Sequence, residues 1–583
     1  MPTLEWIGKD KVINHHQQVP FRVLERKYSY DENGQHIEDN GSENMIIRGD
    51  NLEALKALLP RYEGRIKCIY IDPPYNTGNE NWVYNDNVDD PKIRKWLGEV
   101  VGKEGEDLSR HDKWLCMMYP RLKLLHKLLS DDGVIFISID DTEYANLKLT
   151  CDEIFGSNCF VSNISWQRTY STRNDSKGIV NEVEHLLIYS KQPDWTPNKL
   201  PRTEEMNSKY KNPDNDWTLW RTDNAFAPGA ATHQGMVYAI QHPFTGKMLY
   251  PSNGACWRYQ QDQMLEIMRG WCNYELRDLS DAHERAVVCG VADKDVRQGV
   301  QAIVLSDPLE ISAKKAQKVY ERGQWPRFFF TKGGKGGIAR KTYLENVGGK
   351  LPTNFWPFSE TGHTDEAKKE MLAIFDGRAT FDTPKPRRLL EFILKVAGTE
   401  DALILDSFAG SGTTAHAVLN MNKADGGNRR FILVEMEDYA DSITAERIKR
   451  VIKGYGEGKN AVDGTGGSFS FYDLGAPLLV GDCLNEDVPT EKIREYIWFM
   501  ETKQPYAPTD GDNPYYLGRH NDTGYYFYYE PQCVTVLDYA FLSTIKEKPG
   551  GTIIYADRCS ISEVDLSKMN IVFKKIPRDI SRL

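Results

Sequence analysis

The fold of this 583-residue chain is decided by one segment, Lys67-Cys68-Ile69-Tyr70-Ile71-Asp72-Pro73-Pro74-Tyr75-Asn76-Thr77-Gly78. It begins as an apolar run that favours β-structure and ends in an acid, two prolines and a tyrosine. Because proline cannot continue a central strand, the chain must leave a sheet at this point. We therefore expect Asp72 and Tyr75 at the carboxyl end of a buried strand, where open α/β sheets bind their ligands.

The residues from Asp72 to Tyr75 suit the activation of an amino group on an aromatic ring. Such an amine is a poor nucleophile until other groups accept its N–H hydrogen bonds, and the Asp72 carboxylate and the Pro73 carbonyl are both acceptors. Pro74 completes the turn, and the Tyr75 ring offers a face on which a base removed from its stack can lie. A plain strand followed by a Pro-Pro turn also explains the tetrapeptide, so the rest of the sequence has to decide.

Composition indicates a soluble globular protein of two or three domains, with 40% hydrophobic and 27% charged residues. The sequence contains neither an apolar run long enough to cross a bilayer nor a signal-peptide pattern at its start. Its ten cysteines form no C-x-x-C pair, so we expect no structural metal site and a reducing, cytoplasmic location. The net charge of −11 is only weak evidence against nucleic-acid binding, which depends on local patches.

The βα alternation divides the chain. A strand at 45–48, a helix from Leu52 and the strand before Asp72 form one βαβ unit, which brings Asp50 near Asp72. Asp50 is a candidate for cofactor contact or for a simple helix N-cap. Two further buried strands follow at 134–140 and 184–191. We expect an N-terminal arm at 1–44, a catalytic half at 45–194, an inserted domain of mixed structure, mainly β, at 195–375, a second α/β half at 376–460 and a C-terminal module at 461–583, with 454–467 as a linker.

A glycine-rich turn in the second α/β half indicates a nucleoside-type cofactor. The strand at 403–405 runs into Asp406-Ser407-Phe408-Ala409-Gly410-Ser411-Gly412-Thr413, where glycines let the backbone approach a ligand closely. Glu435 ends the next strand, where an acid can accept hydrogen bonds from both ribose hydroxyls. The spacing from Gly410 to Ala415 also satisfies the G-x-G-x-x-A pattern of nicotinamide-dependent dehydrogenases. That alternative gives no reason for the Asp72 to Tyr75 motif.

Two further groups of residues are candidates for DNA contact. The polar loop after Tyr75 carries Trp82 and Tyr84, and a loop of this length beside a site is usually functional. A basic segment in the inserted region, which lacks the Ser or Thr of a P-loop, is either a phosphate-contacting loop or a plain hairpin tip. Its charged residues are Lys332, Lys335, Arg340 and Lys341.

Together these motifs resemble the S-adenosylmethionine-dependent amino-methyltransferases of DNA. Asp72 to Tyr75 matches their catalytic motif in the adenine-N6 version, where cytosine-N4 enzymes usually have Ser in place of the Asp. Asp406 to Thr413 is similar to their cofactor loop, and Phe381 to Pro386, with Lys385, resembles the motif that touches the methionine part of the cofactor. The catalytic motif precedes the cofactor loop, which is the circularly permuted order of the β group.

Closer similarities point to the modification (Mod) subunits of type III restriction–modification systems. They cover about residues 43–195 and 355–475, and include Gly49 to Leu52, Tyr119 to Leu122, Gly133 to Asp141, Gly362 to Lys368 and Gly466 to Phe469.

The resemblance implies a Rossmann-like methyltransferase fold, circularly permuted, with an inserted target-recognition domain and a C-terminal α+β module. It implies methyl transfer from S-adenosyl-L-methionine to adenine N6 of a flipped base, with duplex DNA, a second copy of the chain and a helicase–nuclease restriction subunit as partners. The implied cofactor contacts are Asp50, Lys385, Asp406, Phe408, Gly410, Gly412, Thr413 and Glu435, and no metal is required.

Other roles stay open beside this one. They are a methyltransferase without a restriction partner or in another phage-defence system, a methyltransferase acting on RNA or on protein glutamine, and a non-catalytic DNA-recognition subunit that positions a nuclease.

Overall fold

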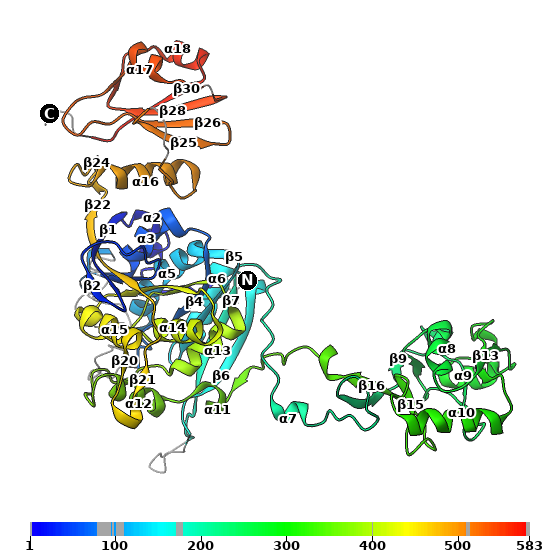
Figure 1. Ribbon diagram of the computed structural model, residues 1–583. Coiled ribbons are helices and arrows are strands. Elements are labelled where there is room, and N and C mark those ends of the chain that lie inside the picture. Colours follow the sequence, from blue (N-terminus) through cyan, green and yellow to red (C-terminus); the bar gives the residue numbers. More distant parts are fainter. Residues whose placement is uncertain are drawn as a thin grey trace. The chain divides into compact units, whose positions relative to one another are not determined.

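The apolar run before Asp72 forms strand β4 (Ile66–Ile71), which lies inside an eleven-stranded sheet (Figure 1). The computed structural model describes residues 3–77, 95, 98–100, 110–170, 179–398, 400–508, 513–547 and 549–578. The chain forms two compact units. Unit 1 comprises residues 1–198 and 352–583 and contains the large sheet, and unit 2 comprises residues 199–351.

The sheet of unit 1 combines parallel and antiparallel neighbours. Its strands are ordered β17 (Phe355–Trp356), β6 (Phe160–Gln167), β7 (Val183–Ser190), β5 (Leu129–Ile139), β4, β18 (Leu403–Asp406), β19 (Arg430–Glu435), β3 (Met45–Arg48), β22 (Phe469–Pro477), β1 (Arg22–Asp31) and β2 (Gly34–His36).

Strand β4 joins the two halves of the chain in this sheet. It pairs in parallel with β5 on one side and with β18 on the other, so that Cys68 lies opposite both Val134 and Ile404. Six neighbouring strands from β5 to β22 run parallel. Their central residues are buried, which explains their near-continuous apolar sequences. The predicted α/β fold in permuted order is confirmed, because strands from both halves alternate within one sheet.

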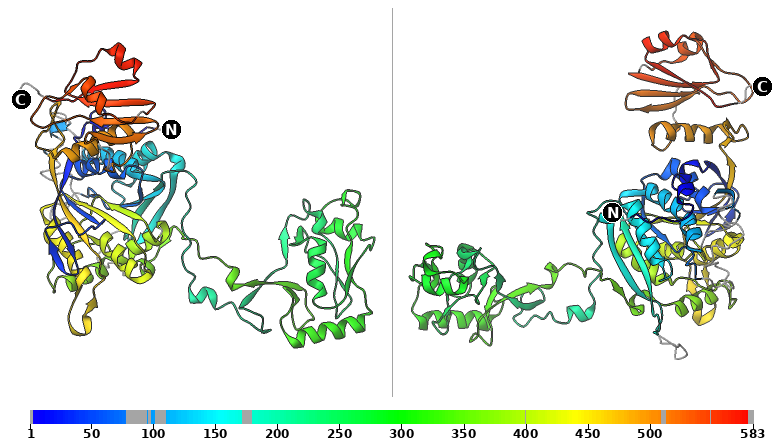
Figure 2. Two further views of the ribbon diagram at one scale, coloured as in Figure 1. Left: turned by 45° about the horizontal axis from the view of Figure 1, so that its top comes forward. Right: turned by 180° about the vertical axis from the view of Figure 1, so that it is seen from behind.

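Helices cover both faces of the sheet (Figures 1 and 2). α3 begins at Asn51 because the Asp50 carboxylate accepts hydrogen bonds from the N–H groups of Leu52 and Glu53. On its face lie α1 (Lys9–Val12), α2 (His15–Gln18), α3 (Asn51–Tyr62), α5 (Arg110–Leu128) and α6 (Tyr144–Phe155). The second segment of unit 1, from residue 352 to the end of the chain, contributes further helices beside the large sheet. They are α11 (Phe358–Thr361), α12 (Thr364–Ile374), α13 (Arg387–Ala397), α14 (Thr413–Asp425) and α15 (Glu446–Lys453).

The large sheet extends beyond the boundaries expected from the sequence. β1, in the expected N-terminal arm, pairs antiparallel with β22. β22 lies in the segment assigned to the C-terminal module, yet it pairs in parallel with β3. The expected linker contains a short antiparallel pair, β20 (Gly454–Tyr455) and β21 (Val462–Asp463). The main sheet therefore continues to Pro477.

The segment after β22 has a small core of its own. α16 (Thr490–Thr502) packs its buried Ile493 and Trp498 against residues of a second sheet, including Leu517 and Tyr525. The strands of that sheet are ordered β25 (Tyr516–His520), β26 (Thr523–Phe527), β28 (Gly551–Ala556) and β30 (Ile571–Lys575), and two helices accompany them, α17 (Tyr539–Thr544) and α18 (Glu563–Lys568).

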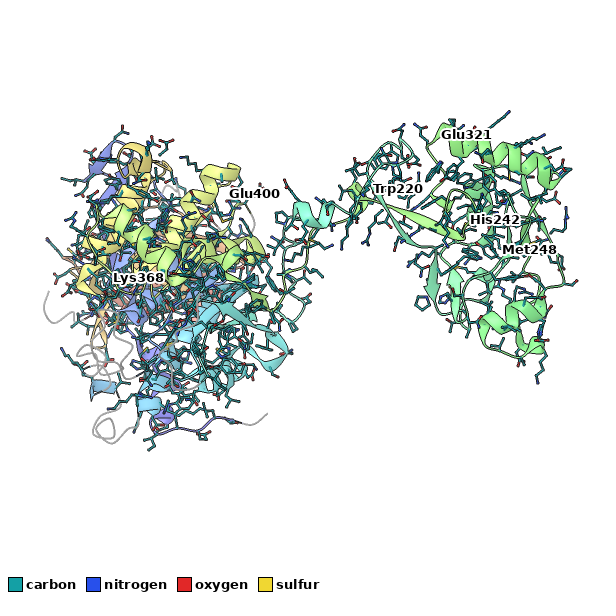
Figure 3. All side chains as sticks on the ribbon, turned by 90° about the horizontal axis from the view of Figure 1, so that it is seen from below. Trp220, His242, Met248, Glu321, Lys368 and Glu400 are labelled. Carbon is teal, nitrogen blue, oxygen red and sulfur yellow. The ribbon has the colours of Figure 1, made fainter. Side chains whose placement is uncertain are left out.

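Unit 2 is a mixed structure, in which strands are accompanied by substantial helices. Its aromatic core includes Trp220 and Trp257, and the buried His242 lies among its strands (Figure 3). Its strands are β8 (Trp220–Asn224), β9 (Phe226–Pro228), β10 (Ile240–Gln241), β11 (Met248–Leu249), β12 (Ala255–Trp257), β13 (Tyr274–Arg277), β14 (Ala302–Leu305), β15 (Phe328–Phe330) and β16 (Ile338–Tyr343); its helices are α7 (Glu204–Asn207), α8 (Gln261–Arg269), α9 (Ala282–Cys289) and α10 (Leu309–Arg322).

Candidate active site

Buried hydrogen bonds to α5 and to the start of α6 hold the turn after β4 in place. The Trp114 indole N–H donates to the Pro74 carbonyl oxygen at 2.7 Å. Asn76 is buried and has a φ of 60°, a left-handed conformation that asparagine tolerates. Its side-chain amide donates to the buried Glu143 carboxylate at 2.5 Å. These contacts hold the Asp-Pro-Pro-Tyr turn against α5 and the start of α6.

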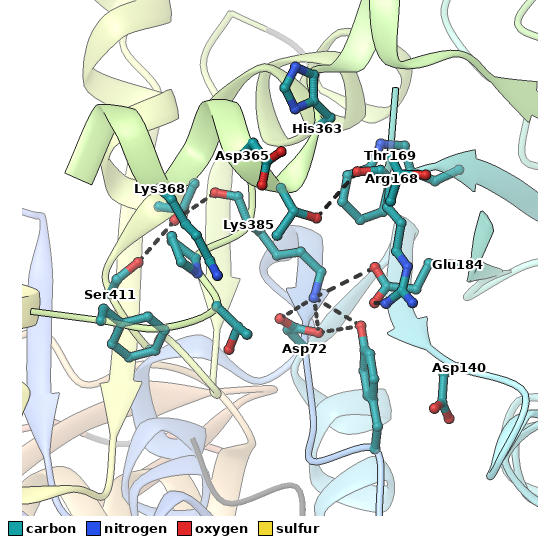
Figure 4. Close-up of a pocket in the computed structure, with 18 of the residues that line it drawn as sticks. Asp72, Asp140, Arg168, Thr169, Glu184, His363, Asp365, Lys368, Lys385 and Ser411 are labelled. Atoms are coloured by element: carbon teal, nitrogen blue, oxygen red, sulfur yellow. Dashed lines mark hydrogen bonds and ion pairs between the residues drawn. The ribbon is translucent and has the colours of Figure 1, made fainter. Parts of the chain in front are cut away.

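Asp72 lies at the centre of a charged cluster (Figure 4). The Lys385 ammonium donates to both Asp72 carboxylate oxygens, at 2.8 and 2.7 Å, and to the Tyr75 hydroxyl at 2.9 Å. The Tyr75 hydroxyl in turn donates to Asp72 at 2.8 Å. Lys385 Nζ also lies 3.9 Å from Glu184 Oε2, and Arg168 approaches the other Glu184 oxygen to 3.8 Å. The cluster thus brings together residues from β4, β6, β7 and the segment before α13.

Burial shifts the ionisation of this cluster. It raises the pKa of Glu184 above its usual value, an effect that the nearby Lys385 ammonium opposes. Burial, reinforced by the negative charge of Asp72, raises the pKa of the Tyr75 hydroxyl well above its usual value. Tyr75 is therefore neutral at physiological pH and acts as a hydrogen-bonding phenol with a flat ring, not as a base.

The glycine-rich turn after β18 forms the opposite wall. The Asp406 carboxylate accepts hydrogen bonds from the Phe408 N–H at 3.1 Å and the Thr414 hydroxyl at 2.5 Å. Gly410 and Gly412 have φ values of 51° and 80°, which side chains rarely adopt. A Cβ on Gly412 would lie 3.2 Å from the Thr444 side chain. This geometry explains why the turn needs glycine at both positions.

Two acids of this wall are buried enough to titrate near neutrality. Burial raises the pKa of Asp406 to about 7, although its two hydrogen bonds oppose the shift. Burial likewise raises the pKa of Glu435 to about 7, opposed by hydrogen bonds from the Glu437 and Gly410 N–H groups at 3.0 and 2.8 Å. Both carboxyls would ionise more readily beside a positively charged ligand.

The two walls enclose one cavity of about 790 Å³ within unit 1. Both motifs line it, because β4 and β18 are parallel neighbours whose carboxyl ends meet at one edge of the sheet. The predicted residues that line it are Asp72, Pro73, Tyr75, Lys385, Asp406, Phe408, Gly410 and Thr413. Among the described residues, no three side chains that commonly bind metals come together, and no helix is long and apolar enough to span a bilayer.

The arrangement of these motifs agrees with a family match. The sequence profile of the DNA methylase family, which covers enzymes acting on N6 and N4 amino groups, matches residues 66–446. The chain belongs to the DNA methylase family.

Proteins similar to this chain include two type III Mod subunits. The StyLTI Mod subunit of Salmonella typhimurium is 33% identical over 444 residues, which cover 71% of this chain and 58% of that subunit. The EcoPI Mod subunit of Escherichia phage P1 is 27% identical over 77% of this chain and 68% of its own length. The match thus spans a little over half of the StyLTI subunit. The type II methyltransferase M.KpnI of Klebsiella pneumoniae is 31% identical over 68% of this chain and 81% of its own length.

Among solved structures, the cytosine-N4-specific PvuII DNA methyltransferase has a TM-score of 0.32 and 13% identity, covering 70% of this chain and 86% of its own. The M1.HpyAVI–SAM complex has a TM-score of 0.26 and 13% identity, with 69% and 98% covered.

Four of the predicted site residues support the cavity instead of lining it. Asp50 caps α3 and accepts a hydrogen bond from the buried Arg121 at 3.2 Å, which is the simpler of its two expected roles. Glu435 braces the Gly410 amide, and the Gly412 backbone faces Thr444. Pro74 is tied to Trp114. None of these four is among the cavity-lining residues that the structure describes.

The basic segment of unit 2 requires one correction. Lys341 is fully buried, and its ammonium donates to Asp214 and Asp216 and, at 2.7 Å, to the Trp325 carbonyl. It therefore cannot contact phosphate and instead neutralises two core aspartates. Arg340 is partly buried and paired with Asp223. Lys332 and Lys335 are exposed in the turn between β15 and β16, so their DNA contact stays a prediction. Trp82 and Tyr84 lie outside the described residues.

Sequence reasoning missed two groups of supporting residues. Glu184 on β7 and Arg168, which directly follows β6, reach the charged cluster around Asp72, and a Glu inside an apolar strand is itself a signal of a special environment. Arg447 is buried beneath the cofactor turn and donates to the hydroxyls of Ser411 and Thr413 at 2.9 and 2.8 Å. Burial lowers the pKa of Arg447 to about 10, so it stays charged and holds the turn.

Proposed function

We propose that this chain transfers a methyl group from S-adenosyl-L-methionine to the N6 amino group of an adenine flipped out of duplex DNA. The observation that carries the proposal is the shared cavity: the Asp72 to Tyr75 turn and the glycine-rich turn after Asp406 line the same space of about 790 Å³. That volume falls in the range of pockets that hold small ligands and cofactors.

The residues present fit the proposed cofactor. S-adenosylmethionine, when bound, supplies an electrophilic methyl group on a positively charged sulfur. Asp406 lines the cavity with a buried carboxyl, and Gly410, which also lines it, has no Cβ to block the close approach of a ligand to the backbone. The hydroxyl of Ser407 is buried without a hydrogen-bond partner in the described part of the chain, which leaves a donor available at this turn. Glu435 would accept hydrogen bonds from ribose hydroxyls once it releases the Gly410 amide.

The chain's own residues would activate the target amine. Asp72 accepts one N–H hydrogen bond and the Pro73 carbonyl accepts the other, which draws electron density toward nitrogen. Because Trp114 occupies the neighbouring Pro74 carbonyl, the turn is fixed with Pro73 lining the cavity. Tyr75, neutral and nearly buried, offers its ring face to the base. Extrusion of a base costs a few kcal/mol, which stacking and phosphate contacts offset.

Adenine is proposed over cytosine because the motif begins with Asp72. In the family that the sequence resembles, enzymes acting on cytosine N4 usually have Ser at this position. The matching family includes enzymes of both specificities. The modified base therefore decides between the two.

We further propose that unit 2 recognises the target sequence in duplex DNA. We also propose that the chain acts as the Mod subunit of a type III system, in which two copies of the chain form a dimer and a separate restriction subunit binds to it. Similarity to the StyLTI and EcoPI Mod subunits supports this role. Similarity to M.KpnI, of which the chain covers 81%, supports the second candidate, a methyltransferase without such a partner.

The test is sequencing of DNA, with modified bases identified, from cells that express either the native chain or Asp72→Ala. We expect N6-methyladenine at one short motif in the first sample and none in the second. The Asp72→Ala protein should still bind cofactor, because the glycine-rich turn is separate from Asp72. Methylation of one strand only would favour the type III role. Methylation by Asp72→Ala at the native level would overturn the mechanism, and N4-methylcytosine would overturn the adenine assignment.

A further inference from the structure

The Lys385 ammonium occupies the hydrogen-bonding position that the target amine requires. It donates to both Asp72 oxygens, at 2.8 and 2.7 Å, and to the Tyr75 hydroxyl at 2.9 Å (Figure 4). The Tyr75 hydroxyl also donates to Asp72. Asp72 thus already accepts three hydrogen bonds in this state. An incoming amino group must displace at least one of them.

A neutral amine competes poorly with an ammonium for a carboxylate. Both donors would form hydrogen bonds to an ionised carboxylate, but only the Lys385 ammonium adds attraction between opposite charges, which is strong in a poorly solvated site. Lys385 is also mostly shielded, with 13% of its side chain exposed, so an ammonium displaced without a new partner would be left poorly solvated. Entry of the amine therefore needs a second acceptor for Lys385 nearby.

Glu184 is placed to be that acceptor. It is buried on β7, and its Oε2 lies 3.9 Å from Lys385 Nζ, so a movement of about 1 Å would bring the two atoms within hydrogen-bond distance. Its other oxygen faces Arg168 at 3.8 Å, also longer than a hydrogen bond. Burial raises the pKa of Glu184, and a closer ammonium would favour its ionised form.

We propose that Glu184 is a positioning residue that receives the Lys385 ammonium when the target amino group binds Asp72. Before the base binds, Lys385 holds Asp72 and Tyr75 in place. When the base binds, Lys385 moves to Glu184, and at least one Asp72 oxygen becomes available to the amine. The inference rests on the proposed function, because it concerns the same amine and the same aspartate.

The test is a double-mutant cycle with Glu184→Gln and Lys385→Met, read as occupancy of the site by the target base. The probe is a duplex that keeps adenine at the methylated position of the motif found by sequencing and carries 2-aminopurine at the neighbouring position, where its fluorescence rises when that adenine leaves the stack. Glutamine has the size of glutamate without its charge. We expect Glu184→Gln alone to weaken base occupancy at least tenfold, and to change it less than twofold when Lys385 is also replaced by Met, because no ammonium then needs a second acceptor.

Each outcome separates the possibilities. If Glu184→Gln lowers base occupancy equally whether residue 385 is the native Lys or Met, the inference is overturned and Glu184 has a purely structural role. Cofactor affinity and the melting temperature of Glu184→Gln should match the native chain, and the loss should fall on the KM for DNA more than on kcat. A native chain that methylates adenine while Glu184→Gln matches it in occupancy refutes the inference alone. A native chain that extrudes no base refutes the proposed function together with it.

Discussion

Replacing Asp406 with asparagine should remove a pH-dependent loss of stability from unit 1. Burial raises the pKa of Asp406 from 3.8 to about 7 in the folded chain. Because the folded state then holds this proton more tightly than the unfolded state, raising the pH from about 4 to about 7 favours unfolding, and the effect is constant above that range. One pKa unit corresponds to about 1.4 kcal/mol, so ionisation of Asp406 destabilises the fold by about 4 kcal/mol at pH 8, of which about 3 kcal/mol develops above pH 5.

The assay is calorimetric unfolding of the native chain and Asp406→Asn between pH 5 and pH 8. The Thr414 hydroxyl and the Phe408 N–H can both still hydrogen-bond an asparagine side chain, so packing is preserved. The variant should gain several degrees in melting temperature relative to the native chain at pH 8, and much less at pH 5.

The matched control is Asp425→Asn, at the end of α14, the helix that also carries Thr414. Arg429 lowers the pKa of Asp425, so its stabilising effect is complete above pH 4 and its removal should cost the same at pH 5 and pH 8. A melting-temperature difference between Asp406→Asn and the native chain that does not change from pH 5 to pH 8 would refute the reasoning.

Three further outcomes follow from the structure. Gly412→Ala should lower stability by about 1–3 kcal/mol and weaken cofactor binding, because this residue has a φ of 80° and a Cβ would crowd Thr444. The control Gly426→Ala, with a φ of 73° but no atom within 4 Å of an added Cβ, should lower stability alone. If the two variants lose cofactor affinity equally in a binding titration, the turn does not act in this way. Lys341→Met should reduce hydrogen-exchange protection in unit 2 by about 3–5 kcal/mol, because it removes the ammonium that pairs with Asp214 and Asp216 inside the unit. Unchanged protection would contradict this expectation. Replacing both Lys332 and Lys335 with Ala should reduce the slope of log affinity for DNA against log salt by about 2; an unchanged slope would exclude phosphate contact.

The parallel core of the fold was predictable because its strands carry two signals in the sequence, an apolar run and an acid at the end of that run. β4, β18 and β19 are apolar runs that each end in an acid, at Asp72, Asp406 and Glu435. Such runs fit only strands buried on both faces. The edges were not predictable in this way: β1 and β22 carry more polar residues, and only their pairing with each other and with β3 shows that they extend the sheet.

The site was predictable in its motifs but not in its contacts. Nothing in the local sequence states that Lys385 reaches Asp72, since 313 positions separate them and only the fold brings them together. Lys341 is different, because the signal was present. In a strand, alternate residues share a face, and Lys341 follows the buried Ala339 by two positions. The density of positive charge in the segment obscured this alternation.

The attachment of unit 2 has a consequence for how the protein can change. The chain enters and leaves this unit side by side, since Leu200 and Lys350 exchange backbone hydrogen bonds at 2.8 Å in both directions. Gly349 makes the close approach feasible, because a Cβ there would meet the Leu200 carbonyl oxygen at 2.4 Å. Both ends of unit 2 therefore pass through one two-stranded stem. Replacing the residues between Leu200 and Lys350 would leave the strand register around Asp72 and Asp406 unchanged. Under the role proposed for unit 2, such an exchange would change target preference without changing the residues of the cavity.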